Sequence, residues 1–222
     1  MNRAEARNSI IVTAANQVGY HANPDKTNKY AAYFDDIHPD FYNGKKNGYD
    51  WCEIFCDWCF CNTFGYDLGR RMIYQPLHSA GAGVNSSASY YKQAGAWSHL
   101  PSLGAQIYFQ DDDGLYHTGL VVGIKDGRVY TIEGNTGDTK GGEVMRHNYP
   151  QNAVYIAGYG VPDWDLAKDT KMSPKDITDE IYKKVLNTLA GEYGTNPERK
   201  KKLGEWYDPV QWVINYYFSQ EG

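Results

Sequence analysis

Hydrophobic and polar positions follow two different periods along this chain. In the first part, apolar residues recur at helical spacing over 3–18 and again over 52–64. The intervening segment, 19–50, is rich in prolines and Asn-Gly pairs, which interrupt regular structure. We therefore expect two helices joined by a loop-rich stretch.

A change to strand-like alternation follows a third, shorter helix, which we expect to be capped by Ser86 or Ser87 and to run through Ala94. Five β-rich runs come next, at 105–110, 116–124, 128–134, 143–149 and 154–160. Asp-Gly pairs stand where hairpin turns between neighbouring runs belong. Helices first and antiparallel strands afterwards predict an α+β fold in which N-terminal helices pack on an antiparallel sheet.

The end of the chain has a separate pattern. We expect a first domain over 1–163, a polar linker over 164–176, and a small three-helix domain over 177–218. The expected helices are 177–189, one with Pro197 as its first residue, and 208–218.

Composition and charge narrow the function classes. The 22 basic and 27 acidic residues give a net charge of −5, and no basic stripe is present, so nucleic acid is not an expected partner. No apolar run reaches the roughly 18 residues that a membrane span needs. The apolar stretch near the N-terminus is broken by Thr13 and Asn16, so we expect no signal peptide and synthesis in the cytoplasm. We also expect the protein to be a monomer. The 20 tyrosines and six tryptophans suit either a glycan-contacting surface or an aromatic-rich core.

Four cysteines lie within ten residues, at 52, 56, 59 and 61. A disulfide framework would spread them along the chain, and their spacing does not match the usual zinc pairs. The pattern favours one reactive thiol with small buried thiols behind it. Cys52 follows Asp50, an expected N-cap, so the helix dipole would favour its thiolate. The alternative is that Cys52 is another buried, inert thiol.

Two further segments carry polar groups suited to activating a thiol. His117 opens an apolar strand, Glu133 ends the next strand, and Asn135 follows two residues later. A cysteine on a helix, a base on a strand and an orienting carboxylate on the neighbouring strand form the papain-like chain order. The alternative for His117 is a half-exposed strand histidine without a catalytic role. Together the three residues predict a cysteine hydrolase that needs no cofactor and no metal.

Residues 8–162 resemble the CHAP domain, the cysteine, histidine-dependent amidohydrolase/peptidase of phage endolysins and bacterial autolysins. The resemblance rests on ANQVGYHA, YDWCEIFCDWC, PSLGAQIYF, HTGLVVG, and IEGNTGD with IAGYG. It implies a papain-like fold in which Cys52 is the nucleophile, His117 the base, Glu133 the orienting residue and Asn135 a further polar member of the site. It also implies peptidoglycan, with its glycan strands and stem peptides, as the substrate.

The segment 177–218 is similar to the Cpl-seven-like cell-wall-binding repeat of phage lysins. That family's Gly-Lys-Trp-Gly-Asn-Gly run is replaced here by Gly191 to Asn196. A single copy implies weak wall binding, since avidity needs several modules. Some CHAP domains bind calcium ahead of the nucleophile, but the loop 23–36 lacks the regular Asp-x-Asp-x-Asp-Gly pattern.

These resemblances lead us to expect a phage or prophage endolysin that acts on the wall after release from the host cytoplasm. The expected reaction is that of an N-acetylmuramoyl-L-alanine amidase, with a stem-peptide or cross-bridge endopeptidase as the alternative, since both use the same thiol chemistry. Two other classes remain: a non-catalytic wall-binding or phage structural protein, and a toxin delivered into rival bacteria.

Overall fold

A computed structural model describes residues 1–169, 184–185, 187–188, 191–207, 210–211 and 214. The chain divides into two compact units, Met1–Thr170 and Lys171–Gly222. Among the described residues, no helix combines the length and apolar composition that crossing a membrane requires.

The first unit begins with two helices, α1 (Arg3–Ala15) and α2 (Lys29–Ile37), whose starts are set by asparagine caps. In α1, the Asn2 side chain accepts the Glu5 amide hydrogen bond, and the Glu5 carboxylate accepts that of Asn2. Asn28 caps α2 by accepting from two backbone amides. The helices are α1 Arg3–Ala15, α2 Lys29–Ile37, α3 Cys52–Phe64, α4 Tyr66–Met72 and α5 Val84–Gln93.

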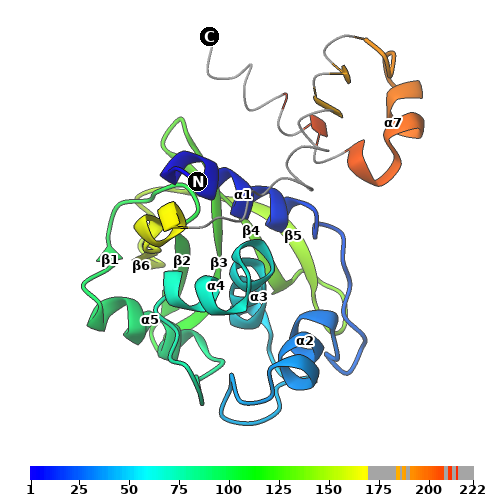
Figure 1. Cartoon of the computed structure of the whole chain (residues 1–222). Helices are drawn as coiled ribbons and strands as arrows, with labels where there is room; N and C mark the ends of the chain where they lie inside the picture. The colour runs from blue at the N-terminus through cyan, green and yellow to red at the C-terminus, as the bar shows by residue number, and fades with distance from the viewer. Residues whose placement is uncertain (170–183, 186, 189–190, 208–209, 212–213, 215–222) are drawn as a thin grey trace. The chain divides into compact units, whose positions relative to one another are not determined.

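The strands follow the helices and form one six-stranded antiparallel sheet. Its order is β1-β6-β2-β3-β4-β5. The strands are β1 Trp97–Ser98, β2 Gln106–Asp111, β3 Gly114–Lys125, β4 Arg128–Thr136, β5 Glu143–Pro150 and β6 Ile156–Gly160. The expected mixed α+β fold with an antiparallel sheet is therefore confirmed (Figure 1).

Helix α3 is the central helix of this unit. Ten of its 13 residues are buried, eight of them apolar and two carrying carboxyl groups, Glu53 and Asp57. It lies against β3 and β4 and also contacts α1, α2, α4 and α5 (Figure 1). Its first residue is Cys52, so the packing of this buried helix determines the position of the thiol that the sequence indicated as reactive.

Several short elements differ from the sequence-based expectation. The segment 19–50, expected to be loop-rich, contains α2, and neither α4 nor β1 was expected. Helix α5 begins at Val84, before either serine expected to cap it, and its N-cap is Gly83, which has no side chain to cap the helix. The Ser87 hydroxyl donates instead to the buried carboxyl of Glu53.

The first unit also extends beyond the expected boundary at 163. The start of the expected linker forms the 3-10 helix η1, Trp164–Asp169, which packs against α1 and α4. Trp164 and Ala167 are buried, and Arg3 forms an ion pair with Asp165. Burial of the indole therefore makes η1 part of the first unit, which ends at Thr170.

In the second unit, the described part includes α7, Glu198–Leu203, and the 3-10 helix η2, Gly204–Trp206. Pro197, which we expected to be the first helical residue, is the N-cap of α7, so the helix begins one position later, at Glu198. The other two expected helices fall largely outside the described residues, although their described members, 184–185, 187–188, 210–211 and 214, have helical backbone.

Two carboxyl groups are buried together on α3, one turn apart. Glu53 and Asp57 are at most 1% exposed, and each accepts one hydroxyl and one amide hydrogen bond. The donors are Ser87 and Gln106 for Glu53, at 2.7 and 2.6 Å, and Tyr42 and Gln75 for Asp57, at 2.7 and 2.8 Å. Burial raises the pKa of Asp57 to about 7 and that of Glu53 well above its usual value.

This pair predicts an unusual pH dependence of stability. The folded state holds protons that the unfolded chain releases above about pH 4, so the pair's contribution falls as pH rises toward the folded pKa values. Glu53→Gln removes one titrating carboxyl and keeps its shape. From pH 5 to 8, the difference in unfolding free energy between wild type and variant should change by up to about 1.4 kcal/mol per pH unit. Denaturant unfolding across this range measures it, and two parallel stability curves would contradict it.

Candidate active site

The N-terminus of α3 presents the thiol of Cys52, which is 6% exposed. The expected cap, Asp50, is wrong: the N-cap is Trp51, whose carbonyl accepts the Phe55 amide hydrogen bond and whose side chain makes no cap. The carboxylate of Asp50 is instead engaged by Lys26 and Asn135. The thiol still lies in the first turn of a 13-residue helix, where the helix dipole favours a thiolate.

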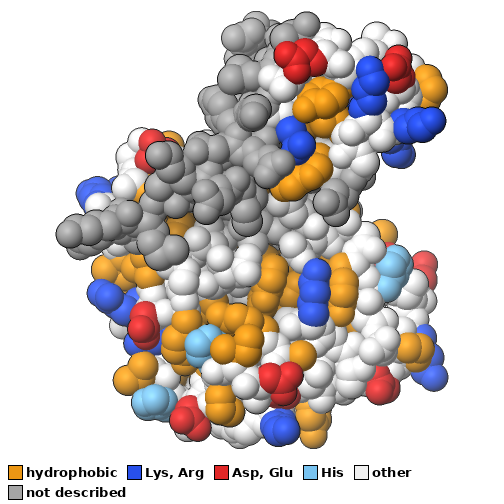
Figure 2. Space-filling model, turned by 45° about the vertical axis from the view of Figure 1, so that its right-hand side comes forward, with side chains coloured by type: hydrophobic (Ala, Val, Ile, Leu, Met, Phe, Trp, Pro, Cys, Tyr) orange, Lys and Arg blue, Asp and Glu red, His pale blue; other side chains and the backbone are white. Residues whose placement is uncertain are grey.

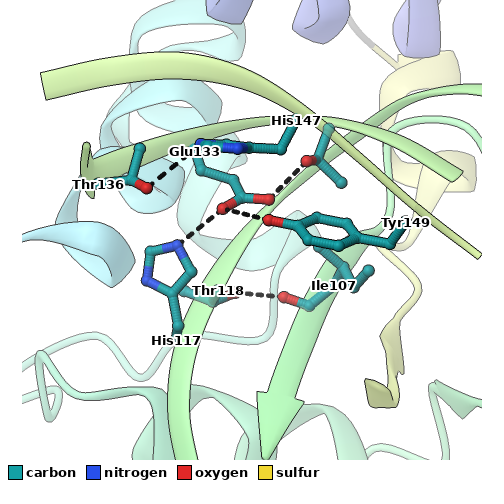
Figure 3. A network of polar contacts seen from close by, with 8 residues as sticks. Ile107, His117, Thr118, Glu133, Thr136, His147 and Tyr149 are labelled. Carbon is teal, nitrogen blue, oxygen red and sulfur yellow. Dashed lines mark hydrogen bonds and ion pairs between the residues drawn. The ribbon is translucent and has the colours of Figure 1, made fainter. Parts of the chain in front are cut away.

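Strands β3 and β4 bring the expected base and carboxylate together. The Nε2–H of His117 donates to Glu133 Oε2 at 2.9 Å (Figure 3). Glu133 is 1% exposed and also accepts hydrogen bonds from the Thr131 hydroxyl at 2.5 Å and the Tyr149 hydroxyl at 3.3 Å. Three donors therefore fix the carboxylate that orients the imidazole.

A glycine makes room for this carboxylate. A Cβ at Gly119, two residues after His117 on β3, would lie 2.3 Å from Glu133 Cγ. Any side chain there would displace Glu133, so the HTGLVVG motif serves the site through its glycine as well as its histidine.

The imidazole of His117 connects the carboxylate to the thiol. Its ring stacks on Phe109, with centroids 5.8 Å apart, and it lies close enough to the Cys52 side chain to interact with it electrostatically. Because Glu133 occupies Nε2, Nδ1 is the nitrogen left to face sulfur. Burial lowers the pKa of His117, but the hydrogen bonds and charges of Cys52 and Glu133 outweigh it and raise the pKa to about 10. The imidazolium form is thus favoured at neutral pH, and its charge stabilises the thiolate.

Close packing sets the distance between the helix and the strand. A Cβ at Gly134 on β4 would lie 2.6 Å from Trp51 and 2.7 Å from Phe55, so only glycine allows this approach. The Trp51 indole donates to the Gly141 carbonyl at 2.9 Å and stacks on Tyr30. These contacts hold the start of α3 beside the end of β4.

Asn135, the fourth expected site residue, lies at this end of β4. Its backbone has a left-handed φ of 55°, and its side-chain amide donates to Asp50 Oδ1 at 3.0 Å. The structure therefore brings Cys52, His117 and Glu133 together, with a hydrogen bond between His117 and Glu133, and bonds the Asn135 side chain to the segment that precedes Cys52.

Sequence reasoning missed three supporting residues. Thr131 alternates with Glu133 along β4, so its position on the same face was readable from strand periodicity. Tyr149 reaches the site from β5 and Gly119 from β3, and only the pairing of these strands with β4 places them beside Glu133.

The remaining polar candidates have local roles. All four cysteines are free and buried, with Cys56 one helical turn beyond the nucleophile. In the loop 23–36, Asp25 accepts from Thr27, and Asp35 accepts from the backbone amides of Lys46 and Asn47. On the face of the first unit seen in Figure 2, acidic and basic side chains are interspersed among uncharged ones.

Comparison with known families agrees with this geometry. Residues 44–135 match the profile of the CHAP domain. The chain contains a CHAP domain. No curated protein and no solved structure matches the chain.

The matched range begins before Cys52 and ends at Asn135, so the four candidate site residues all lie within it. The flanking motifs ANQVGYHA and IAGYG lie outside the match but inside the first compact unit. A CHAP domain implies a cysteine- and histidine-dependent amidohydrolase or peptidase that acts on peptidoglycan.

Proposed function

We propose that this protein is a peptidoglycan hydrolase, of the phage or prophage endolysin type, with a papain-like catalytic domain. The observation that carries the proposal is the grouping of Cys52 with the hydrogen-bonded pair His117–Glu133 inside a CHAP domain. A thiol at a helix N-terminus, paired with an imidazolium that a buried carboxylate orients, is an arrangement suited to acyl transfer.

The reaction follows from the positions of the protons. The Cys52 thiolate attacks the amide carbonyl carbon, the C–N bond breaks, and the His117 imidazolium gives its proton to the leaving nitrogen. This step leaves a thioester and a neutral imidazole. A water molecule then attacks the thioester, giving a proton to His117, and the C–S bond breaks to release the acid and restore the thiolate–imidazolium pair. Glu133 keeps the ring in place in both halves.

Among the amides of peptidoglycan, we favour the bond between the lactyl carboxyl of the sugar and L-alanine, as in N-acetylmuramoyl-L-alanine amidases. The test is mass spectrometry of purified peptidoglycan digested by the full-length protein. An amidase frees intact stem peptides with a new alanine amino terminus, whereas an endopeptidase leaves shortened peptides on the glycan. Digestion with Cys52→Ala is the control, and the absence of any new end group from the wild-type digest overturns the proposed function.

For the second unit, we propose that residues 177–218 bind the cell wall. One support is their resemblance to a wall-binding repeat. The other is the group of basic residues on α7, where Lys202 pairs with Glu198 and Lys200 lies over the Tyr207 ring. A single module raises the local concentration of enzyme only modestly.

Removing residues 171–222 should leave the chemistry intact and weaken action on whole walls. Because η1 belongs to the first unit, the truncated protein should end at Thr170 and keep Trp164. We expect cleavage of soluble wall fragments near the full-length rate, and about tenfold weaker lysis of intact walls. Turbidity loss and sedimentation with purified peptidoglycan measure the two effects. Unchanged lysis of intact walls by 1–170 would exclude a wall-binding role.

A further inference from the structure

We propose that Asp50 is a positioning residue whose carboxylate ties the segment before the nucleophile to the end of β4, and that Asn135 acts on the reaction through this tie. The proposal rests on the proposed function only for its substrate-based measurement.

The tie joins the two elements that must meet for catalysis. Asp50 stands two residues before Cys52, and Asn135 stands two residues after Glu133. The Asn135 side-chain amide donates to Asp50 Oδ1 at 3.0 Å. The same oxygen accepts from Lys26 Nζ at 2.6 Å, so a third segment converges on the carboxylate.

The backbone at the end of β4 is shaped to present this amide. Asn135 adopts a left-handed φ of 55°, which asparagine tolerates better than most side chains. Gly142 packs directly against it, because a Cβ at Gly142 would lie 2.9 Å from Asn135 Cα. A left-handed conformation held by close packing aims the side chain at Asp50.

The charge of Asp50 also suits the site. The hydrogen bond from Lys26 lowers the pKa of Asp50, and Asn135 and the charge of His117 lower it further. Asp50 is thus ionised at neutral pH, within range to attract the His117 imidazolium. This negative charge adds to that of Glu133 in holding the charged ring near Cys52.

Asp50 is well placed for a test because the fold does not depend on it. Its side chain is 72% exposed, and the separate Trp51–Gly141 hydrogen bond remains when Asp50 is changed. Variants at this position should therefore keep the wild-type melting temperature, so a loss of rate reports on geometry and not on unfolding.

The experiment is a double-mutant cycle in the full-length protein. Asp50→Ala and Asn135→Gly, which suits the left-handed backbone, are measured singly and together. Each single change should lower kcat on soluble wall fragments by about tenfold with little change in KM, since small misplacement of a nucleophile costs rate and not binding. The double variant should lose no more than either single one.

Two further variants separate the hydrogen bond from the charge. Asn135→Asp places two carboxylates side by side, and because they repel each other this variant should be slower than Asn135→Gly. Adding Asp50→Asn to it restores an amide–carboxylate hydrogen bond with the two groups exchanged. We expect this swap to recover most of the rate. Lys26→Met, which leaves the Asp50–Asn135 bond in place, is the matched control and should stay within a few-fold of wild type.

The same double-mutant cycle can be measured without peptidoglycan, as the rate at which iodoacetamide alkylates Cys52. Mass spectrometry of the modified peptide follows this rate. Failure of the wild-type protein to cut wall fragments would reject the proposed function while this measurement still tests Asp50. Additive losses of about a hundredfold in the double variant, a wild-type rate for Asp50→Ala, or no recovery in the swap would each overturn the positioning role.

Discussion

Replacing Cys52 by alanine is expected to lower the rate of wall lysis by about 10⁴-fold or more while the protein stays folded. Without the thiol, His117 and Glu133 can still hold and polarise a water molecule, but no acyl-enzyme can form. The change removes one sulfur atom from a side chain that is 6% exposed, so the loss of stability should not exceed the roughly 1–2 kcal/mol expected for a fully buried cysteine, and the protein should stay folded. Turbidity assays on wall suspensions, together with circular dichroism, separate lost chemistry from lost structure.

Cys56→Ala is the matched control for this prediction. Cys56 lies one turn further along α3 and is fully buried, so its loss creates a small cavity that lowers stability by about 1–2 kcal/mol without touching the reacting atoms. Its kcat should stay within a few-fold of wild type. If Cys56→Ala were as inactive as Cys52→Ala in a folded protein, or if Cys52→Ala kept a tenth of the wild-type rate, the nucleophile would be misassigned.

The central elements of the fold were predictable because their signals are local. The apolar run of α3 ends at Gly65, whose positive φ of 81° no other residue adopts as easily, and its expected bounds of 52–64 are those observed. Strands β2 to β6 lie within a few residues of their expected positions, since strand alternation and Asp-Gly turns are read over short windows.

The shorter elements were missed because non-local packing stabilises them. Helix α4 has seven residues and η1 six, too few to show a periodic pattern of their own. Each is held by contacts with the rest of the unit, as when Trp164 of η1 is buried beside Gly104 and Phe60. A polar segment with a single tryptophan looks like a linker until its partners are known.

Within the site, the residue types that carry chemistry were readable, and their supporting partners were not. A cysteine at the start of a helix, with a histidine and a glutamate on two later neighbouring strands, was sufficient to predict Cys52, His117 and Glu133 as site residues. Asp50 was misread because local sequence offers an aspartate before a helix as a cap, whereas the structure offers it a non-local amide from Asn135 and an ammonium group from Lys26. The charge-assisted hydrogen bond with Lys26 is stronger than the bond that Asp50 would make as a helix cap.

Replacing His117 by alanine is expected to lower kcat/KM by about 10³-fold, because the thiolate loses its counter-ion and the leaving nitrogen loses its proton donor. His147→Ala is the control: this histidine lies on β5, where its ring contacts Thr136, and its loss should cost little (Figure 3). A full rate for His117→Ala, with activity lost in His147→Ala, would move the base to β5.

Removing the charge of Glu133 should lower the rate less than removing His117 does, and it should shift the pH dependence of the rate. In Glu133→Gln the amide oxygen still accepts from the imidazole, and the Thr131 hydroxyl can turn to accept from the new amide, so the ring stays oriented and the loss is about tenfold. The imidazolium disappears as pH rises through the pKa of His117, which is about 10, and the Glu133 charge is one of the causes that raise it. Removing that charge lowers the pKa, so the alkaline fall of kcat/KM should begin at lower pH in Glu133→Gln than in wild type. Rate profiles from pH 6 to 11 on soluble wall fragments measure the shift, and superimposable alkaline limbs would show that Glu133 does not act on the imidazole.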